Sequence, residues 1–362
     1  MAKEYKNILV HAIMNLGDVV LATSVVPIIK AKFPNAKVTF MVRSSLVSIL
    51  ENSDFIDEVI GYDYKSRGNY FSVYNFSTEL KKYNFDFAIS LDSRFRLALV
   101  TWFANIPERV GSLSVFDKKP GLEKHFYTTY IDLKNYNTKE HLQAENYQEI
   151  VKRFLQSDKT GMPFIGKATK EDYDFADNII NTLPKKDLTI GFCINTNYAL
   201  KNWPPERFTE LIRLLKQKYD PNIVITGIKE DEEIAEAILK PLEDTSAIIN
   251  LCGKTSLKQM AALFQKFNFM VTLDNGTSHI AAALDIPLVT IFGCTPPTRV
   301  KPITEYCFVV SANLDCCPCS IRPNECPQHE CMQKISVEEV TQSVDKLVET
   351  LKAANKLYKS DI

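Results

Sequence analysis

The chain has 362 residues, more than one hydrophobic core usually supports, so two domains are expected. Its formal net charge of −1 excludes a general attraction to nucleic acid, and any acidic partner would have to bind a local patch. No apolar run has the length of a membrane span, and no signal-peptide core follows Met1. We therefore expect a cytoplasmic protein.

The first half of the chain alternates apolar strands with amphipathic helices, which predicts a parallel sheet covered on both faces. Residues 62–76 lack clean periodicity and are expected to form an irregular loop, and residues 157–169 a linker. The expected strands are 7–13, 37–42, 58–60 and 85–91, and the expected helices are 19–33, 45–51 and 139–155.

The second half repeats this α/β alternation. A closing amphipathic helix is predicted over 336–358, with Ser336 as its N-cap. The other expected strands are 188–194, 222–226 and 247–250, and the other expected helices are 205–219, 231–242 and 256–264.

The stretch 271–293 reads as a strand, a polar loop, a short helix and a second strand. Asp274 closes the first strand, Gly276 permits a sharp turn, and Thr277 or Ser278 can cap the helix. Free N–H groups at such a helix N-terminus bind anions, most often phosphate. The alternative is an ordinary turn in which Asp274 only caps the helix.

The loop after the first strand contains one glycine and one carboxylate, Gly17 and Asp18. Neither half has Gly-x-Gly-x-x-Gly after its first strand, which disfavours a dinucleotide dehydrogenase, and the P-loop motif is absent from the sequence. A carboxylate in this loop suits a general base better than a phosphate cradle. Alternatively, Asp18 caps the helix that follows.

Four segments of the chain carry a resemblance to a known family: 15–23, 201–208, 274–284 and 291–296. With a weaker block at 94–111, they resemble glycosyltransferase family 9, the heptosyltransferase-type enzymes. The resemblance implies a GT-B fold, in which two Rossmann-like domains face each other across a cleft. It also implies inverting transfer of a sugar from a nucleotide sugar, typically ADP-heptose, to the inner core of lipopolysaccharide.

The resemblance also implies a domain division. An acceptor-binding domain is expected over 1–165, and a nucleotide-sugar-binding domain over 166–335, with a cysteine-rich loop at 316–331. The last segment, 336–362, is expected to cross back and pack on the N-terminal domain. Contact with the cytoplasmic face of the inner membrane would be peripheral.

By the resemblance, Asp18 is the base that deprotonates the acceptor hydroxyl, and Lys201 meets the donor diphosphate. For Lys201 the alternative is a solvated lysine before a helix. Asp231 or Glu232 could meet the ribose, or could belong to an acidic first helical turn. The other implied donor contacts are Asp274 to the sugar hydroxyls, Asn275 (where the family commonly has threonine), Gly276, Thr277, Ser278, His279, which could instead hold the loop in shape, and Gly293.

Acceptor recognition is expected in the N-terminal domain, where arginine and lysine can bind phosphate or carboxylate groups of an acidic saccharide. Part of this set is expected to be solvated surface. The candidates are Gly17, Arg43, Lys65, Arg67, Arg94, Arg96 and Arg109.

Four cysteines, Cys316, Cys319, Cys326 and Cys331, have the number and compact spacing for a structural zinc or iron ion. Disulfides, or free thiols packed as small hydrophobes, are the alternatives. Catalysis itself is expected to need no metal or other cofactor, since lysine and helix N-termini neutralise the diphosphate in GT-B enzymes.

Two other functions remain open at this point. A transferase of the same fold could use a different acceptor, such as a protein hydroxyl or another surface glycan. A non-catalytic nucleotide-sugar binder would not need a base, so the presence of both Asp18 and Lys201 argues against it.

Overall fold

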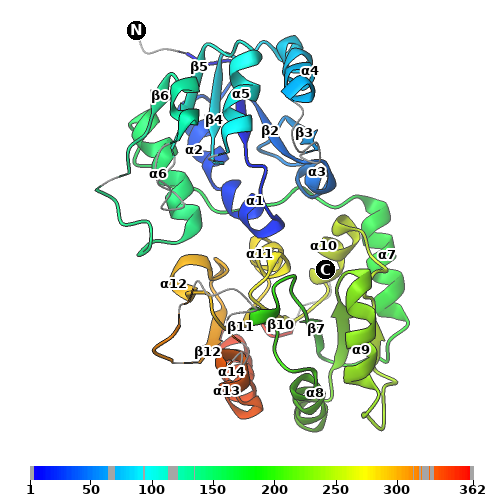
Figure 1. Ribbon diagram of the computed structural model, residues 1–362. Helices are drawn as coiled ribbons and strands as arrows, with labels where there is room; N and C mark the ends of the chain where they lie inside the picture. Colours follow the sequence, from blue (N-terminus) through cyan, green and yellow to red (C-terminus); the bar gives the residue numbers. More distant parts are fainter. Residues whose placement is uncertain are drawn as a thin grey trace. The chain divides into compact units, whose positions relative to one another are not determined.

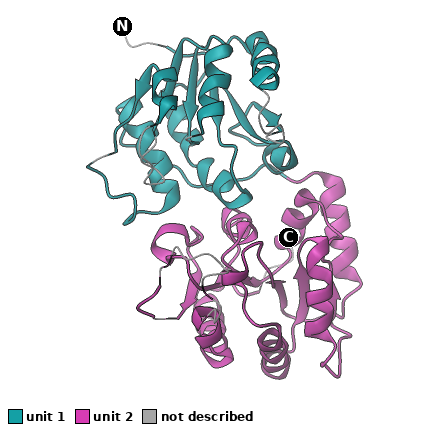
Figure 2. Cartoon of the chain, viewed as in Figure 1, with its two compact units in different colours: residues 1–167 teal, residues 168–362 magenta. Residues whose placement is uncertain are grey.

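The computed structural model describes residues 4–63, 70–92, 94–112, 121–133, 135–312, 314–317, 319, 326 and 330–358. The chain divides into two compact units, residues 1–167 and 168–362 (Figure 2). This boundary lies two residues after the expected one at 165/166. Each unit is built on a six-stranded sheet accompanied by helices (Figure 1).

Unit 1 has the strand order β3-β2-β1-β4-β5-β6, and all five neighbouring pairs are parallel. Its strands are β1 (Asn7–His11), β2 (Lys37–Arg43), β3 (Glu58–Tyr62), β4 (Phe87–Ser90), β5 (Glu108–Gly111) and β6 (Thr129–Tyr130). Its helices are α1 (Leu16–Ala22), α2 (Val25–Lys32), α3 (Val47–Leu50), α4 (Tyr70–Leu80), α5 (Phe95–Phe103) and α6 (Gln143–Leu155), with short 3-10 turns η1 (Ser44–Leu46), η2 (Lys81–Tyr83) and η4 (Leu122–Phe126).

Unit 2 has the order β12-β11-β10-β7-β8-β9, again with every neighbouring pair parallel. Its strands are β7 (Thr189–Cys193), β8 (Asn222–Thr226), β9 (Ile248–Asn250), β10 (Phe269–Leu273), β11 (Leu288–Phe292) and β12 (Cys307–Ser311). Its helices are α7 (Lys170–Asn181), α8 (Pro205–Tyr219), α9 (Glu232–Leu239), α10 (Leu257–Phe264), α11 (Gly276–Ala283), α12 (Pro297–Val300), α13 (Glu330–Lys334) and α14 (Val337–Ala353), with 3-10 turns η5 (Ala199–Lys201) and η6 (Lys229–Asp231).

Both sheets therefore have the same doubly wound, Rossmann-like order, which confirms the predicted α/β class. Five central strands, β4, β7, β8, β10 and β11, are buried along their whole length, and β1 is buried except at Asn7, as expected for parallel strands covered on both faces. In each sheet the strand order reverses between two central strands, β1 and β4 in unit 1 and β7 and β10 in unit 2. Open α/β sheets bind their ligands beyond the carboxyl ends of the strands at this switch point.

Two expectations about unit 1 are wrong. The helix predicted over 19–33 is two helices, α1 and α2, separated at Thr23 and Ser24. Pro27 explains the break, because proline has no N–H to donate to the carbonyl of Thr23 in a continuous helix. The expected loop over 62–76 contains the start of α4, whose inward face is Val73, Ser77 and Leu80. Residues 64–69 lie outside the described part.

Helix α14 begins as predicted. The Ser336 hydroxyl accepts a hydrogen bond from the Glu339 N–H at 3.2 Å, and the Glu339 carboxylate accepts one from the Ser336 N–H at 2.7 Å. The helix packs against α8, β11 and β12, and its apolar face lies in the core of unit 2. Packing of this last helix on the N-terminal unit stays a prediction. Among the described helices, none combines the length and apolar composition needed to cross a bilayer.

Candidate active site

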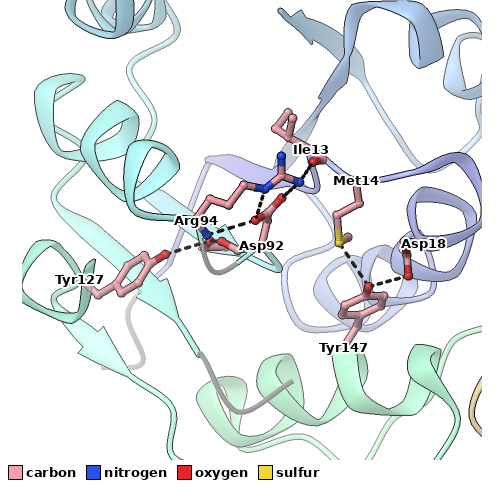
Figure 3. Close-up of polar contacts among 8 residues, drawn as sticks. Ile13, Met14, Asp18, Asp92, Arg94, Tyr127 and Tyr147 are labelled. Atoms are coloured by element: carbon pink, nitrogen blue, oxygen red, sulfur yellow. Dashed lines mark hydrogen bonds and ion pairs between the residues drawn. The ribbon is translucent and has the colours of Figure 1, made fainter. Parts of the chain in front are cut away.

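Asp18 lies at the switch point of unit 1, in the first turn of α1, directly after β1. The N-cap position of this helix belongs to Asn15, so the helix starts earlier than the sequence suggested. The partly buried Asp18 carboxylate accepts a hydrogen bond from the Tyr147 hydroxyl of α6 at 3.3 Å (Figure 3). Gly17 stands beside Asp18 in the same turn. The Asp18 carboxylate is thus held by a residue of another helix, and its role as base stays a prediction.

The loop after β4, on the other side of the switch point, contributes Asp92 and Arg94. The Arg94 guanidinium donates to Asp92 Oδ1 at 2.9 Å and lies 2.6 Å from Asp92 Oδ2, and it also donates to the carbonyl of Ile13 (Figure 3). Asp92 is buried. Arg94 thus ties the β4 loop to the β1 loop, which is a structural use of a side chain predicted to bind acceptor.

His11, at the end of β1, is fully buried. Burial first, and the positive charge of Arg94 second, lower the pKa of His11 to about 3. Neither ring nitrogen has a hydrogen-bond partner among the described residues. The imidazole is therefore neutral near pH 7 and adds no charge to the switch point.

The remaining predicted acceptor contacts have different surroundings. Arg109 donates to the carbonyls of Phe126 and Ile106, so its guanidinium holds a loop. Arg96 lies over the Tyr70 ring, 5.8 Å from its centre. Arg43 ends β2, and its buried Nε has no hydrogen-bond partner in the described part of the chain. Lys65 and Arg67 lie outside the described residues.

In unit 2 the loop after β10 leads into α11, whose N-cap is Asn275. The Asn275 side-chain oxygen accepts from the Ser278 N–H at 3.1 Å and from the Thr277 hydroxyl at 2.5 Å. The prediction that Thr277 or Ser278 caps the helix is therefore wrong, because the strand ends one residue before Asp274 and α11 begins at Gly276. The helix N-terminus nevertheless stands at the switch point, where the anion site was expected.

Lys201, from the loop after β7, meets Asp274, from the loop after β10. Their side chains form an ion pair of 2.6 Å, in which Asp274 is 5% exposed and Lys201 24% exposed. The structure thus brings together two predicted donor-site residues that are far apart in the sequence. Contact of Lys201 with a donor diphosphate stays a prediction.

His279, in the second turn of α11, is buried. Burial lowers the pKa of His279 to about 4, and Lys201 also lowers it whereas Asp274 raises it. The ring is neutral near pH 7, so it can supply a hydrogen bond but not a charge.

Asp231 forms hydrogen bonds with other residues of unit 2. Its carboxylate accepts from the Asn195 side-chain amide at 2.7 Å and from the Ile228 N–H at 2.9 Å, and the residue is buried. The Asn275 amide in turn donates to the Asn195 carbonyl at 3.2 Å. These bonds join the loops after β7, β8 and β10, and they favour a structural role for Asp231 over contact with a ribose.

The other two predicted donor contacts also have partners within unit 2. Glu232 pairs with Lys229 and stands at the start of α9. At Gly293 a Cβ would meet Met332 Sδ at 2.6 Å and the Leu200 carbonyl oxygen at 2.9 Å. Close packing, not ligand contact, is the reason this structure gives for that glycine.

The predicted metal ligands Cys316, Cys319, Cys326 and Cys331 are all described, and all four are free thiols. No group of three or more His, Cys, Asp or Glu residues in the described part of the chain is placed to hold a metal ion. The expectation of a zinc or iron site is therefore unsupported. Three of these cysteines instead pack on the core of unit 2 as small apolar side chains, namely Cys319, Cys326 and Cys331.

Residues 73–329 match the family described as Glycosyltransferase family 9 (heptosyltransferase). This chain belongs to glycosyltransferase family 9. The matched range includes Lys201 and the 274–279 loop and begins after Asp18. As a family 9 member, the protein is a glycosyltransferase, as the resemblance predicted.

Relatives of this family 9 chain carry heptosyltransferase names. It is 26% identical to the lipopolysaccharide heptosyltransferase 2 of Salmonella typhimurium over 316 residues, which are 82% of this chain and 85% of that protein. It is also 26% identical to the lipooligosaccharide heptosyltransferase 2 of Campylobacter jejuni over 342 residues, 94% of this chain and 98% of that one.

Solved structures agree on the fold. The ADP-heptose lipopolysaccharide heptosyltransferase II of E. coli has a TM-score of 0.78 at 22% identity and covers 96% of this chain and 99% of its own. A family 9 glycosyl transferase from Veillonella parvula has a TM-score of 0.82 at 24% identity, covering 97% and 99%. The GT-B class expected from the resemblance is thereby confirmed.

The sequence pointed to Asp18 and Lys201, but not to Asp92 or Tyr147. Asp92 could have been found, because it is a polar residue shortly after a buried strand, and that strand lies at the switch point. Tyr147 could not have been found, because a tyrosine in an amphipathic helix is ordinarily core.

Proposed function

We propose that this protein transfers a heptose from ADP-heptose to an acidic acceptor of the lipopolysaccharide-core type, with inversion at the anomeric carbon. The observation that carries the proposal is the Lys201–Asp274 pair at the N-terminus of α11, on the switch point of unit 2. Free N–H groups of the helix and one lysine suit a diphosphate. The names of the family 9 relatives support the sugar and the acceptor class.

In the proposed reaction the acceptor hydroxyl oxygen attacks the anomeric carbon while ADP departs from the opposite side. Asp18 takes the proton of the hydroxyl, and the new glycosidic bond replaces the bond to the diphosphate. Lys201 and the N–H groups of Gly276 and Thr277 offset the negative charge that grows on ADP. With these groups present, the mechanism uses no metal ion.

The proposed acceptor is a glycolipid, so the protein would act in the cytoplasm, peripherally on the inner membrane. Arg43 is the strongest remaining candidate for an acceptor phosphate or carboxylate, since Arg94 and Arg109 are committed to protein oxygens. Arg96 and Gly17 are proposed as further contacts of the acceptor.

The test is a transfer assay with ADP-heptose and a truncated lipopolysaccharide core, on the wild type and on Asp18→Asn. The product's anomeric configuration is read by NMR. The proposal expects an inverted linkage from the wild type and at least about a 10³-fold lower turnover in Asp18→Asn, which cannot accept the proton. Retention of configuration, or full activity of Asp18→Asn, would contradict it. Transfer only to a protein or another glycan would change the acceptor and keep the enzyme class.

A further inference from the structure

Tyr147 contacts Asp18, the proposed base, although the two residues are far apart in the sequence. It lies on α6, which packs against α1, and the residue is fully buried. Its hydroxyl is 3.3 Å from Asp18 Oδ1 and 3.3 Å from Met14 Sδ. Figure 3 draws both contacts. The hydroxyl thus reaches the first turn of α1 from a helix more than a hundred residues later in the chain.

The side chains of Asp18, Met14 and Gln143 lie at the Tyr147 hydroxyl, with the charge of Asp92 nearby, and their chemistry decides where the phenol proton goes. A phenol has one proton to donate, and a carboxylate is a far stronger acceptor than a thioether. Burial, and then the charge of Asp18, raise the pKa of Tyr147 well above its ordinary value. The hydroxyl therefore remains protonated near neutral pH, and it donates to Asp18.

We propose that Tyr147 is a positioning residue for the transfer reaction, because its buried hydroxyl holds the Asp18 carboxylate in one orientation. This inference rests on the proposed role of Asp18 as base. A buried hydroxyl is costly unless it is hydrogen-bonded, and phenylalanine would fill the same volume without that cost. The hydroxyl is thus explained by the carboxylate it contacts, not by packing.

The experiment compares Tyr147→Phe with Tyr127→Phe in the full chain. Tyr127, labelled in Figure 3, is the matched control, because it is another buried tyrosine of unit 1. Its hydroxyl donates a hydrogen bond to Ser90 Oγ at 3.0 Å. For Tyr147→Phe we expect kcat to fall about 10-fold, with the KM for ADP-heptose within about twofold of wild type. Tyr127→Phe should change neither.

The pH profile separates positioning from packing. A hydrogen bond to a carboxylate favours its charged form, so its loss raises the pKa of the base. The acidic limb of kcat/KM should move up by as much as about one pH unit in Tyr147→Phe and should not move in Tyr127→Phe. An unmoved limb in Tyr147→Phe, or an equal shift in both variants, overturns the inference.

Two further measurements keep the inference distinct from the function proposed above. If Asp18→Asn is inactive and Tyr147→Phe behaves as wild type, only the role of Tyr147 is contradicted. If Asp18→Asn is active, the proposed role of Asp18 as base and the role of Tyr147 are both contradicted. Should Tyr147→Phe fail to fold, 3-fluorotyrosine placed at 147 gives a stronger donor. The acidic limb of kcat/KM of this variant should move to lower pH, and an unmoved limb would overturn the role of the hydroxyl.

Discussion

Asp18 and Lys201 occupy equivalent places in their units, each in the loop or first turn that follows the first strand of a doubly wound sheet. Each is held by a buried partner, Tyr147 for the carboxylate and Asp274 for the ammonium. A charged group fixed in this way is already oriented when a ligand arrives, so less ordering is required on binding.

Replacing Lys201 by methionine removes the point charge that the proposed donor diphosphate would meet. We predict a Kd for ADP-heptose about 10- to 100-fold higher, because a charge-assisted contact to phosphate is lost. Calorimetric titration measures this change. Lys216→Met is the control, since Lys216 pairs with Asp244 at 2.7 Å on the surface of α8. An equal loss in both variants would show that the effect is not local to the site.

At the scale of single elements, the stability of helix α11 depends on its N-cap residue, Asn275. Asn275 satisfies N–H and O–H donors at the start of the helix and anchors the Asn195 carbonyl. Removal of such a cap exposes these donors without partners, which costs about 1 kcal/mol of helix stability.

We therefore predict that Asn275→Ala lowers the free energy of unfolding by about 1 kcal/mol and also weakens binding of ADP-heptose. Asn275→Thr, which keeps a capping oxygen, should restore most of both. Chemical denaturation and titration of the same preparations give the two quantities. An unchanged affinity of Asn275→Ala for ADP-heptose would show that the start of α11 does not contact this ligand.

The elements that could be predicted from sequence are those with a strong local pattern. Helix α8 and strand β8 begin and end where predicted, because Pro205 starts the helix and an uninterrupted apolar run forms the strand. The break at Thr23 and Ser24 was missed although Pro27 marks it, because the apolar spacing over 19–33 continues across the break. The start of α4 at Tyr70 was missed because residues 62–76 show no clear helical period.

The same limit applies to the candidate site. The loops that bear Asp18, Lys201 and Asp274 could be predicted, because polar residues directly after buried strands gather at one sheet edge. Their contacts could not: Tyr147 reaches Asp18, and Arg94 reaches the Ile13 carbonyl, only through the fold. The ribose contact of Asp231 was predicted from its position after a strand. The hydrogen bonds of Asp231 to Asn195 and Ile228 depend on the three-dimensional structure.

At the scale of the whole molecule, the described residues include one buried, neutral histidine in each unit, His11 and His279. The pKa is lowered to about 3 for His11 and to about 4 for His279, mainly by burial. The unfolded chain, with ordinary histidines of pKa about 6.5, binds more protons than the folded protein below that pH. Stability therefore falls as the pH is lowered from 6.5 toward these folded-state values.

Substituting His11 by leucine tests this linkage. Between pH 7 and pH 5 the variant should lose about 2 kcal/mol less stability than the wild type, because one proton-binding difference has been removed. Urea denaturation at each pH measures the difference. Parallel pH dependence of the two proteins would mean that His11 titrates normally in the folded state.

The central claim is that unit 2 binds a nucleotide sugar and unit 1 supplies the base. Calorimetry with ADP-, UDP- and GDP-sugars, on the wild type and on Asp18→Ala, tests it most directly when paired with a transfer assay. We predict that ADP-heptose binds both proteins with similar affinity and that only the wild type transfers the sugar. Binding of none of these nucleotide sugars to the wild type, or transfer by Asp18→Ala, would contradict the claim.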